Sequence, residues 1–107
     1  MVKAIKAAKL ADQLRDYLAS WAIPDLPGYL FSITQVTLTP DLQRAIVWVD
    51  VLDASRQATI MKKLNEKAHS YQKRLHATFQ RQIVPKIVFK ADERPELSDR
   101  FDELLNQ

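Results

Sequence analysis

The stretch Thr59–Lys90, TIMKKLNEKAHSYQKRLHATFQRQIVPKIVFK, decides how this chain folds. Its apolar residues recur at intervals of three and four, which keeps them on the side of a helix that faces a core. They are Ile60, Leu64, Ala68, Tyr71, Leu75 and Phe79. Pro85 cannot continue a helix, and Ile87 and Phe89 after it share one face of a strand. The stretch therefore predicts a long amphipathic helix followed by a strand from Lys86 to Ala91.

The polar side of this helix is almost wholly basic. From Arg56 to Lys90 the chain has nine Lys or Arg residues and one acid, Glu66, which gives a net charge of +8. Residues 1–55 carry a net charge of −1 and residues 91–107 a net charge of −4. At about 100° of rotation per residue, one flank of the apolar stripe carries a row of cations. The row consists of Lys63, Lys67, Arg74 and Arg81. Such asymmetry favours a polyanionic partner, although a solvated helix surface is the simpler explanation.

Length and composition narrow the class of protein. A chain of 107 residues predicts a single domain spanning residues 1–107. The absence of Cys fits a reducing compartment, so we expect a cytoplasmic protein. The longest apolar run, Ala45–Val49, is far shorter than the ~20 residues of a membrane span. Met1–Ser20 has acids among its lysines and no apolar centre, so it is expected to be part of the domain and not a signal peptide.

The first half of the chain predicts a helix and a hairpin. Val2–Trp21 has a helical apolar period, and the prolines of the segment 23–28 are expected to exclude helix there. Tyr29–Thr39 is rich in β-branched and aromatic residues, but its alternation slips, which predicts a β-bulge near Thr34–Gln35. Thr39–Leu42 is a turn, and Arg44–Leu52 returns as a second strand.

The second half completes an α+β fold. Asp53 or Ser55 is expected to cap the long helix, since both are good N-cap residues. A helical crossover between the second and third strands permits parallel pairing. Pro95–Leu105 predicts a short last helix with Leu97, Phe101, Leu104 and Leu105 facing inward. Helices packed on one face of a three-stranded sheet are the simplest arrangement of these elements.

The residues offer little support for catalysis. Without Cys, few nucleophiles are available, and no enzyme activity is expected. His69 and His76 are seven residues apart, about 10 Å along a helix axis, so they cannot together ligate one ion. A single glycine, Gly28, rules out a Gly-rich phosphate loop. We therefore expect no metal, no cofactor and no small-molecule substrate.

Once the hairpin and basic helix are placed, the chain resembles the bacterial ribosome-binding factor A family over most of its length. The matching segments, in order, are Asp25–Gly28, Ile33–Val36, Thr39–Leu42, Ala45–Val51, Leu64, Ala68, Arg74–Leu75, Pro85–Phe89, Asp92 and Phe101–Leu105. The family is similar to type-II KH domains, with the element order α-β-β-α(α)-β. The resemblance thus implies a single KH-like domain.

One departure from the family concerns its characteristic helix break, an Ala-x-Gly kink. The matching positions here are Ala68, His69 and Ser70, so serine replaces the glycine. Serine lacks glycine's ease at positive φ, and a sharp left-handed kink would cost about 1 kcal/mol or more. We expect a milder bend at these three residues.

The resemblance implies a non-enzymatic factor that binds the small ribosomal subunit and its rRNA during late maturation and supports processing of the rRNA 5′ end. A monomer is expected. The RNA-binding residues expected on this basis are Lys63, Lys67, His69, Ser70, Lys73, Arg74, Arg81 and Lys86. Two alternatives stay open: a general KH-like module for RNA or single-stranded nucleic acid, and a protein-interaction domain.

Overall fold

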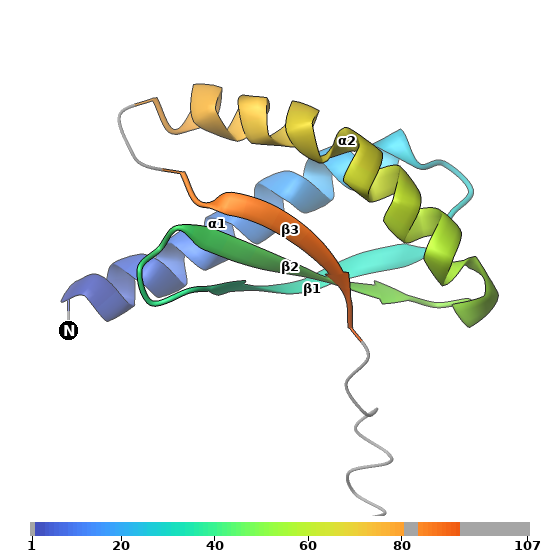
Figure 1. Ribbon diagram of the computed structural model, residues 1–107, viewed down its shortest axis with the longest axis horizontal. Coiled ribbons are helices and arrows are strands. Elements are labelled where there is room, and N and C mark those ends of the chain that lie inside the picture. The colour runs from blue at the N-terminus through green and yellow to red at the C-terminus, as the bar shows by residue number, and fades with distance from the viewer. Residues whose placement is uncertain (1, 81–83, 93–107) are drawn as a thin grey trace, which may run out of the picture.

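The computed structural model describes residues 2–80 and 84–92. The elements are helix α1 (Val2–Asp25), strand β1 (Phe31–Leu38), strand β2 (Arg44–Val51), the 3-10 turn η1 (Ala54–Arg56), helix α2 (Gln57–Thr78) and strand β3 (Lys86–Ala91) (Figure 1). The predicted last helix at 95–105 and the predicted RNA-binding residue Arg81 lie outside the described residues.

The three strands form one sheet in the order β1-β2-β3. β1 and β2 are antiparallel, as expected of a hairpin, and β3 pairs with β2 in parallel from Arg44↔Lys86 to Val49↔Ala91. The parallel pairing follows from the crossover through α2, which returns the chain to the end of the sheet at which β2 began. The predicted third strand is confirmed, and it runs in the parallel direction that the crossover permits.

The predicted β-bulge is also confirmed. The register of β1 on β2 shifts between Ile33 and Gln35. Ile33 and Val36 are both buried although they lie three residues apart, an odd spacing that regular alternation would place on opposite faces. The extra residue at Thr34 reconciles the two, so that apolar residues on both sides of the bulge reach the core.

The turn between β1 and β2 is held by one threonine and one aspartate. The amide of Leu42 donates to the carbonyl of Thr39 at 2.8 Å, which closes the predicted turn. The Asp41 carboxylate accepts from the Thr39 hydroxyl at 2.7 Å and from the Gln43 amide at 3.1 Å. These two hydrogen bonds, the threonine's first, lower the pKa of Asp41.

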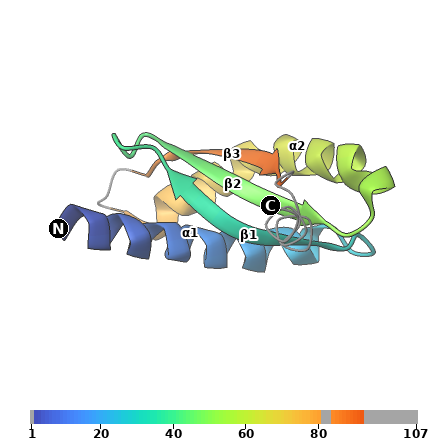
Figure 2. The ribbon, with the colours of Figure 1, turned by 90° about the horizontal axis from the view of Figure 1, so that it is seen from below.

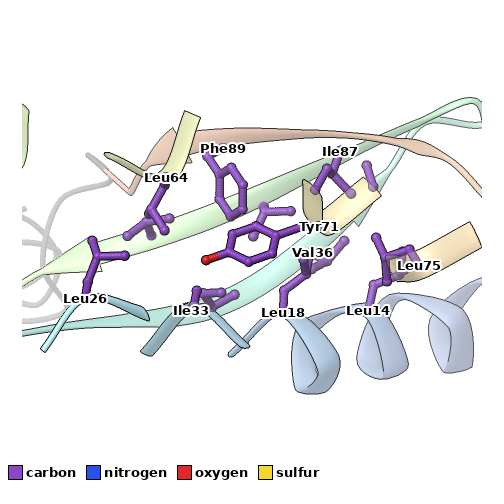
Figure 3. Packing of buried hydrophobic residues seen from close by; sticks show 14 of the residues in the cluster. Leu14, Leu18, Leu26, Ile33, Val36, Leu64, Tyr71, Leu75, Ile87 and Phe89 are labelled. Carbon is purple, nitrogen blue, oxygen red and sulfur yellow. The ribbon is translucent and has the colours of Figure 1, made fainter. Parts of the chain in front are cut away.

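Both helices pack on one face of the sheet, α1 against β1 and α2 against β3 (Figures 1 and 2). Figure 3 shows Tyr71 of α2 at the centre of the core, among side chains from α1, β1 and β3. The fully buried part of this core includes Leu14, Leu18, Val47, Val49, Ile60, Leu64, Tyr71 and Leu75. On the opposite face of the sheet Ile46, Trp48 and Val88 are half-buried, although neither helix covers it. The α+β fold class predicted from periodicity is confirmed.

The end of α1 differs from the prediction. The helix continues past Trp21 to Asp25 and includes Pro24, so the expectation that the prolines exclude helix there was wrong. Proline removes only the bond that its own N–H would make to the carbonyl of Ser20, and Ser20 is exposed, where water can replace that donor. Ala22 and Leu26 are buried on either side of Pro24 and keep this last turn packed on the core.

The start of α2 differs from the prediction, because neither Asp53 nor Ser55 is the N-cap residue of the long helix itself. The Asp53 side chain accepts hydrogen bonds from the amide of Ser55 at 3.0 Å and from its hydroxyl at 2.7 Å. Asp53 therefore caps η1, and this 3-10 turn leads directly into α2, whose own N-cap residue, Arg56, makes no side-chain cap bond. The Ser55 hydrogen bonds lower the pKa of Asp53.

Helix α2 is continuous from Gln57 to Thr78, through Ala68, His69 and Ser70. Its axis changes direction along its length, between the yellow-green and the gold parts of the ribbon in Figure 1. A helix can bend in this way while it keeps its hydrogen bonds, whereas a sharp kink needs a cause such as Pro or Gly. That Ala68, His69 and Ser70 form the bend remains a prediction.

Candidate nucleic-acid interface

Cationic side chains lie along one flank of the buried stripe of α2. Ile60, Leu64, Tyr71 and Leu75 face the core. On the flank toward the end of α1 and the turn that follows it lie four cationic side chains, which we call the cationic flank. They are Arg56, Lys63, Lys67 and Arg74.

The Arg74 guanidinium lies over an aromatic ring of α1. The guanidinium carbon lies 4.2 Å from the centroid of the Trp21 ring, within the range of a strong cation–π contact. Trp21 is itself held between two tyrosines, with ring centroids 5.7 Å from Tyr17 and 6.3 Å from Tyr71. The buried Tyr71 thus connects the core to the surface position of Arg74.

Two more cations share one ring in the turn after α1. The Arg56 guanidinium lies 5.0 Å and the Lys63 ammonium 5.6 Å from the centroid of the Tyr29 ring. Arg56 also donates to the carbonyl of Gly28 at 3.3 Å. Gly28 has φ 85°, a left-handed conformation that glycine adopts at least cost, and so allows the turn that brings Tyr29 beneath the two cations.

A shallow depression of about 280 Å³ lies beside this ring. It is lined by Asp25, Leu26, Pro27, Tyr29, Lys63, Glu66 and Lys67. Two carboxylates therefore neighbour the cationic flank. One of them, Asp25, accepts a hydrogen bond of 2.7 Å from the Tyr71 hydroxyl. Burial, and then this carboxylate, raise the pKa of Tyr71 far above its usual value, so its hydroxyl stays a donor.

The other side of α2 faces β3 and is chemically different. A second depression there is lined by Gln43, Asn65, Ala68, His69, Gln72, His76, Val84, Lys86 and Ile87. Gln72 links α2 to the start of β3 here. Its side-chain amide nitrogen donates to the Pro85 carbonyl at 3.0 Å, and its side-chain oxygen accepts from the Ile87 amide at 2.9 Å. Both predicted RNA-binding residues of this side, His69 and Lys86, are exposed.

The predicted RNA-binding residues thus do not form one cluster. Lys63, Lys67 and Arg74 come together on the cationic flank, whereas His69 and Lys86 lie on the β3 side. Ser70 and Lys73 are exposed on α2. Within residues 2–80 and 84–92, the ion pairs are those of Arg15 with Asp12 and Asp16, so no described carboxylate forms an ion pair with an α2 cation.

Sequence reasoning missed three residues of this surface. Arg56 was counted in the basic stretch but not placed beside Lys63, although the two are seven residues apart and so share a helix side. Trp21 and Tyr29 were missed because their contacts with the cations join segments far apart in the chain. No local sequence pattern indicates such a contact.

The described residues give no sign of a metal site or a membrane segment. No three His, Asp or Glu side chains among them gather closely enough to hold a metal ion. Neither described helix is long and apolar enough to cross a membrane. The two histidines of the β3-side depression are both exposed.

A three-stranded sheet with two helices on one face, the second of them basic, defines a small α+β protein. A family model described as ribosome-binding factor A matches residues 6–105. The chain belongs to the ribosome-binding factor A family.

Individual relatives agree with this assignment. The ribosome-binding factor A of Zymomonas mobilis is 31% identical over 107 residues, which cover 94% of this chain and 76% of that protein. That of Maricaulis maris is 33% identical over 84 residues, 78% of this chain and 60% of that protein. This chain thus spans less than two thirds of the second relative.

A solved structure has the same fold. The crystal structure of ribosome-binding factor A from Thermus thermophilus superposes with a TM-score of 0.67 at 20% identity, covering 79% of this chain and 94% of that one. The family is named for ribosome binding and not for a catalytic activity.

Proposed function

We propose that this protein binds the small ribosomal subunit and its rRNA during late maturation and supports processing of the rRNA 5′ end. It acts without catalysis, as a single domain spanning residues 1–107, a monomer and a cytoplasmic protein. The observation that carries the proposal is the cationic flank of a member of the ribosome-binding factor A family, whose cations form no ion pair with a described carboxylate.

The physical mechanism is a difference in affinity for two RNA states. A protein stabilises one RNA conformation over another only by as much as it binds that conformation more tightly. The cationic flank lies where α2 contacts α1 and the turn after it, so the fold sets where its charges stand, and it fits best those RNA folds that present phosphates at matching positions. Release on maturation follows when the phosphates move.

Contacts to phosphate explain more of this surface than contacts to bases. Arginine and lysine supply charge and donors to phosphate oxygens without reading sequence. The rings of Trp21 and Tyr29 have cations on their faces, so they are not open platforms for base stacking. The surface recognises the shape and charge of folded RNA.

Sedimentation through a sucrose gradient tests the assignment. The tagged protein should travel with precursors of the small subunit in preference to mature subunits and free RNA. Equal recovery with any RNA would support the general KH-like module instead. Absence from every ribosomal fraction would contradict the proposal.

Charge reversal tests the surface. The double variant Lys67→Glu and Arg74→Glu should lose subunit association while it stays folded, since neither residue is on the buried stripe. The double variant Lys9→Glu and Lys90→Glu makes the same charge change at exposed positions of α1 and β3 and should bind like the parent chain. Parent-like binding by the Lys67→Glu and Arg74→Glu double variant would show that the cationic flank is only a solvated surface.

Salt dependence separates RNA binding from the protein-interaction alternative. If about five phosphates are neutralised, log affinity against log salt concentration should have a slope of about −3.5 to −4.5. A slope near zero would favour a protein partner.

A further inference from the structure

We propose that Trp21 and Tyr29 are positioning residues of the RNA-binding site, which hold Arg74, Arg56 and Lys63 in a fixed row for phosphate contacts. The inference rests on the proposed function and adds to it a distinction between the cations of η1 and α2 that contact a ring and those that do not. Three cations are held in place by aromatic rings, and the exposed lysines beside them are not.

Arg74 lies over the ring of Trp21, and a guanidinium in such a position can keep its N–H groups for another partner. A guanidinium that lies on a ring uses its flat face, and its N–H groups point outward in the plane, where they can bind two phosphate oxygens at once. At 4.2 Å from the ring centroid, the contact holds the guanidinium close to the ring. The ring cannot easily turn away, because Tyr17 and Tyr71 flank it.

Tyr29 fixes the distance between two charges. Arg56 and Lys63 are both within 5.6 Å of the centroid of its ring, and Tyr29 is itself half-buried. Arg56 has a second tether, its 3.3 Å hydrogen bond to the carbonyl of Gly28. Arg56 and Lys63 are therefore both anchored to one segment, the turn that contains Gly28 and Tyr29.

The exposed lysines of α2 provide the contrast. Lys62 and Lys73 also belong to α2, but within the described residues neither side chain lies over an aromatic ring. A long side chain that is free in solution must be immobilised when it binds, which costs about 0.5–1.5 kcal/mol for each. Converted at 1.4 kcal/mol per tenfold, an aromatic support therefore improves affinity by about 2- to 12-fold.

Neighbouring residues allow a matched comparison. Arg74→Gln and Lys73→Gln each remove one positive charge from adjacent positions of α2. Binding of the amino-terminally labelled protein to purified precursors of the bacterial small ribosomal subunit is measured by fluorescence anisotropy at several salt concentrations. Arg74→Gln should weaken binding more than Lys73→Gln. Arg74→Lys, which keeps the charge but not the flat stacked group, should also weaken it.

Variants of the ring separate positioning from charge. Trp21→Leu keeps Arg74 and should bind about 2- to 12-fold more weakly with the salt slope unchanged, because the number of phosphate contacts is the same. Arg74→Gln should make the slope shallower by roughly 0.7–0.9. Trp21→Phe and Tyr29→Phe, which keep a ring face, should recover most of the affinity that Trp21→Leu and Tyr29→Leu lose.

Folding is checked in the same samples by circular dichroism, and only variants that are folded at the assay temperature are compared. Parent-like affinity in folded Trp21→Leu and Tyr29→Leu would overturn the inference, as would an equal loss in Lys73→Gln and Arg74→Gln. Failure of the parent chain to bind the subunit precursors would instead reject the proposed function itself.

Discussion

The hydroxyl of Tyr71 donates a hydrogen bond of 2.7 Å to the carboxylate of Asp25, which joins the middle of α2 to the last residue of α1. Tyr71 is only 1% exposed, whereas Asp25 is exposed. The bond therefore runs from the core to the surface, beside Trp21 and the cationic flank. It ties down the helix end that the sequence did not predict.

Tyr71→Phe should lower the free energy of unfolding by about 1–2 kcal/mol, since it removes one hydrogen bond to a charged group and keeps the ring in place. Because the Asp25 carboxylate is exposed, water replaces the lost donor and limits the cost. Urea denaturation measures the change. Tyr17→Phe removes the hydroxyl of an exposed tyrosine on α1 and should cost less; an equal cost would contradict the role of the Tyr71 bond.

The same hydroxyl predicts how the stability of the fold changes at alkaline pH. The pKa of Tyr71 is raised, mainly by burial, so the unfolded chain loses this proton before the folded one does. Stability that is present below the usual tyrosine pKa of 10.0 should fall as the pH rises through and beyond that value. In thermal unfolding, Tyr71→Phe should lose less stability than the parent chain over this range. Parallel pH profiles would show that Tyr71 does not couple to unfolding.

Asp53 gives a prediction at acid pH. Its hydrogen bonds to Ser55 lower its pKa in the folded chain, so the unfolded state binds this proton first. The stabilisation should be complete above the usual value of 3.8 and should be lost as the pH falls through the folded pKa. Asp53→Asn keeps an acceptor for η1 but does not titrate. Its melting temperature should therefore fall less on acidification than that of the parent, while Asp50→Asn controls for the loss of an exposed carboxylate.

Gln72 gives a prediction about the sheet edge. Gln72→Met keeps the length of the side chain but leaves the Pro85 carbonyl and the Ile87 amide without their partner. The expected cost is about 1–3 kcal/mol, together with faster hydrogen exchange at the Ile87 amide. Lys73→Met, at the next and exposed position, should leave both quantities near the parent values. Unchanged exchange at Ile87 in Gln72→Met would contradict the assignment.

Substitution of Gly28 tests how much its left-handed backbone conformation contributes to stability. A Cβ built at this position meets no atom within 4 Å, so Gly28→Ala adds no clash. It must still hold φ near 85°, which should cost about 1–2 kcal/mol in urea denaturation. Gly28→Asn should cost less, since asparagine tolerates this region better. If alanine and asparagine cost the same, conformational strain is not the cause.

Much of the fold could be predicted from local patterns. The slip in alternation between Ile33 and Val36 located the bulge, and Pro85 located the start of β3 to the residue. The end of α1 could not be predicted in this way. Whether a proline ends a helix depends on whether the lost hydrogen bond faces water and whether the next turn is packed, and both are properties of the surroundings.

The candidate site could be predicted only in part. Lys63, Lys67 and Arg74 come together as the helical period indicated. His69 and Lys86, included because of the family resemblance, lie on the other side of α2. Charge and spacing identify which residues are cationic and which share a helix flank, but not what each flank faces.

By itself, the sequence determined the elements, their order and the concentration of positive charge on α2, because hydrophobic period, turn residues and charge act over a few residues. Only the tertiary structure decided how that charge is presented. Trp21 and Tyr29 are far from Arg74 and Lys63 along the chain, and their rings reach these cations because α1, the Gly28 turn and α2 pack on one core. Contacts of this kind depend on the position of whole elements, which no local pattern specifies.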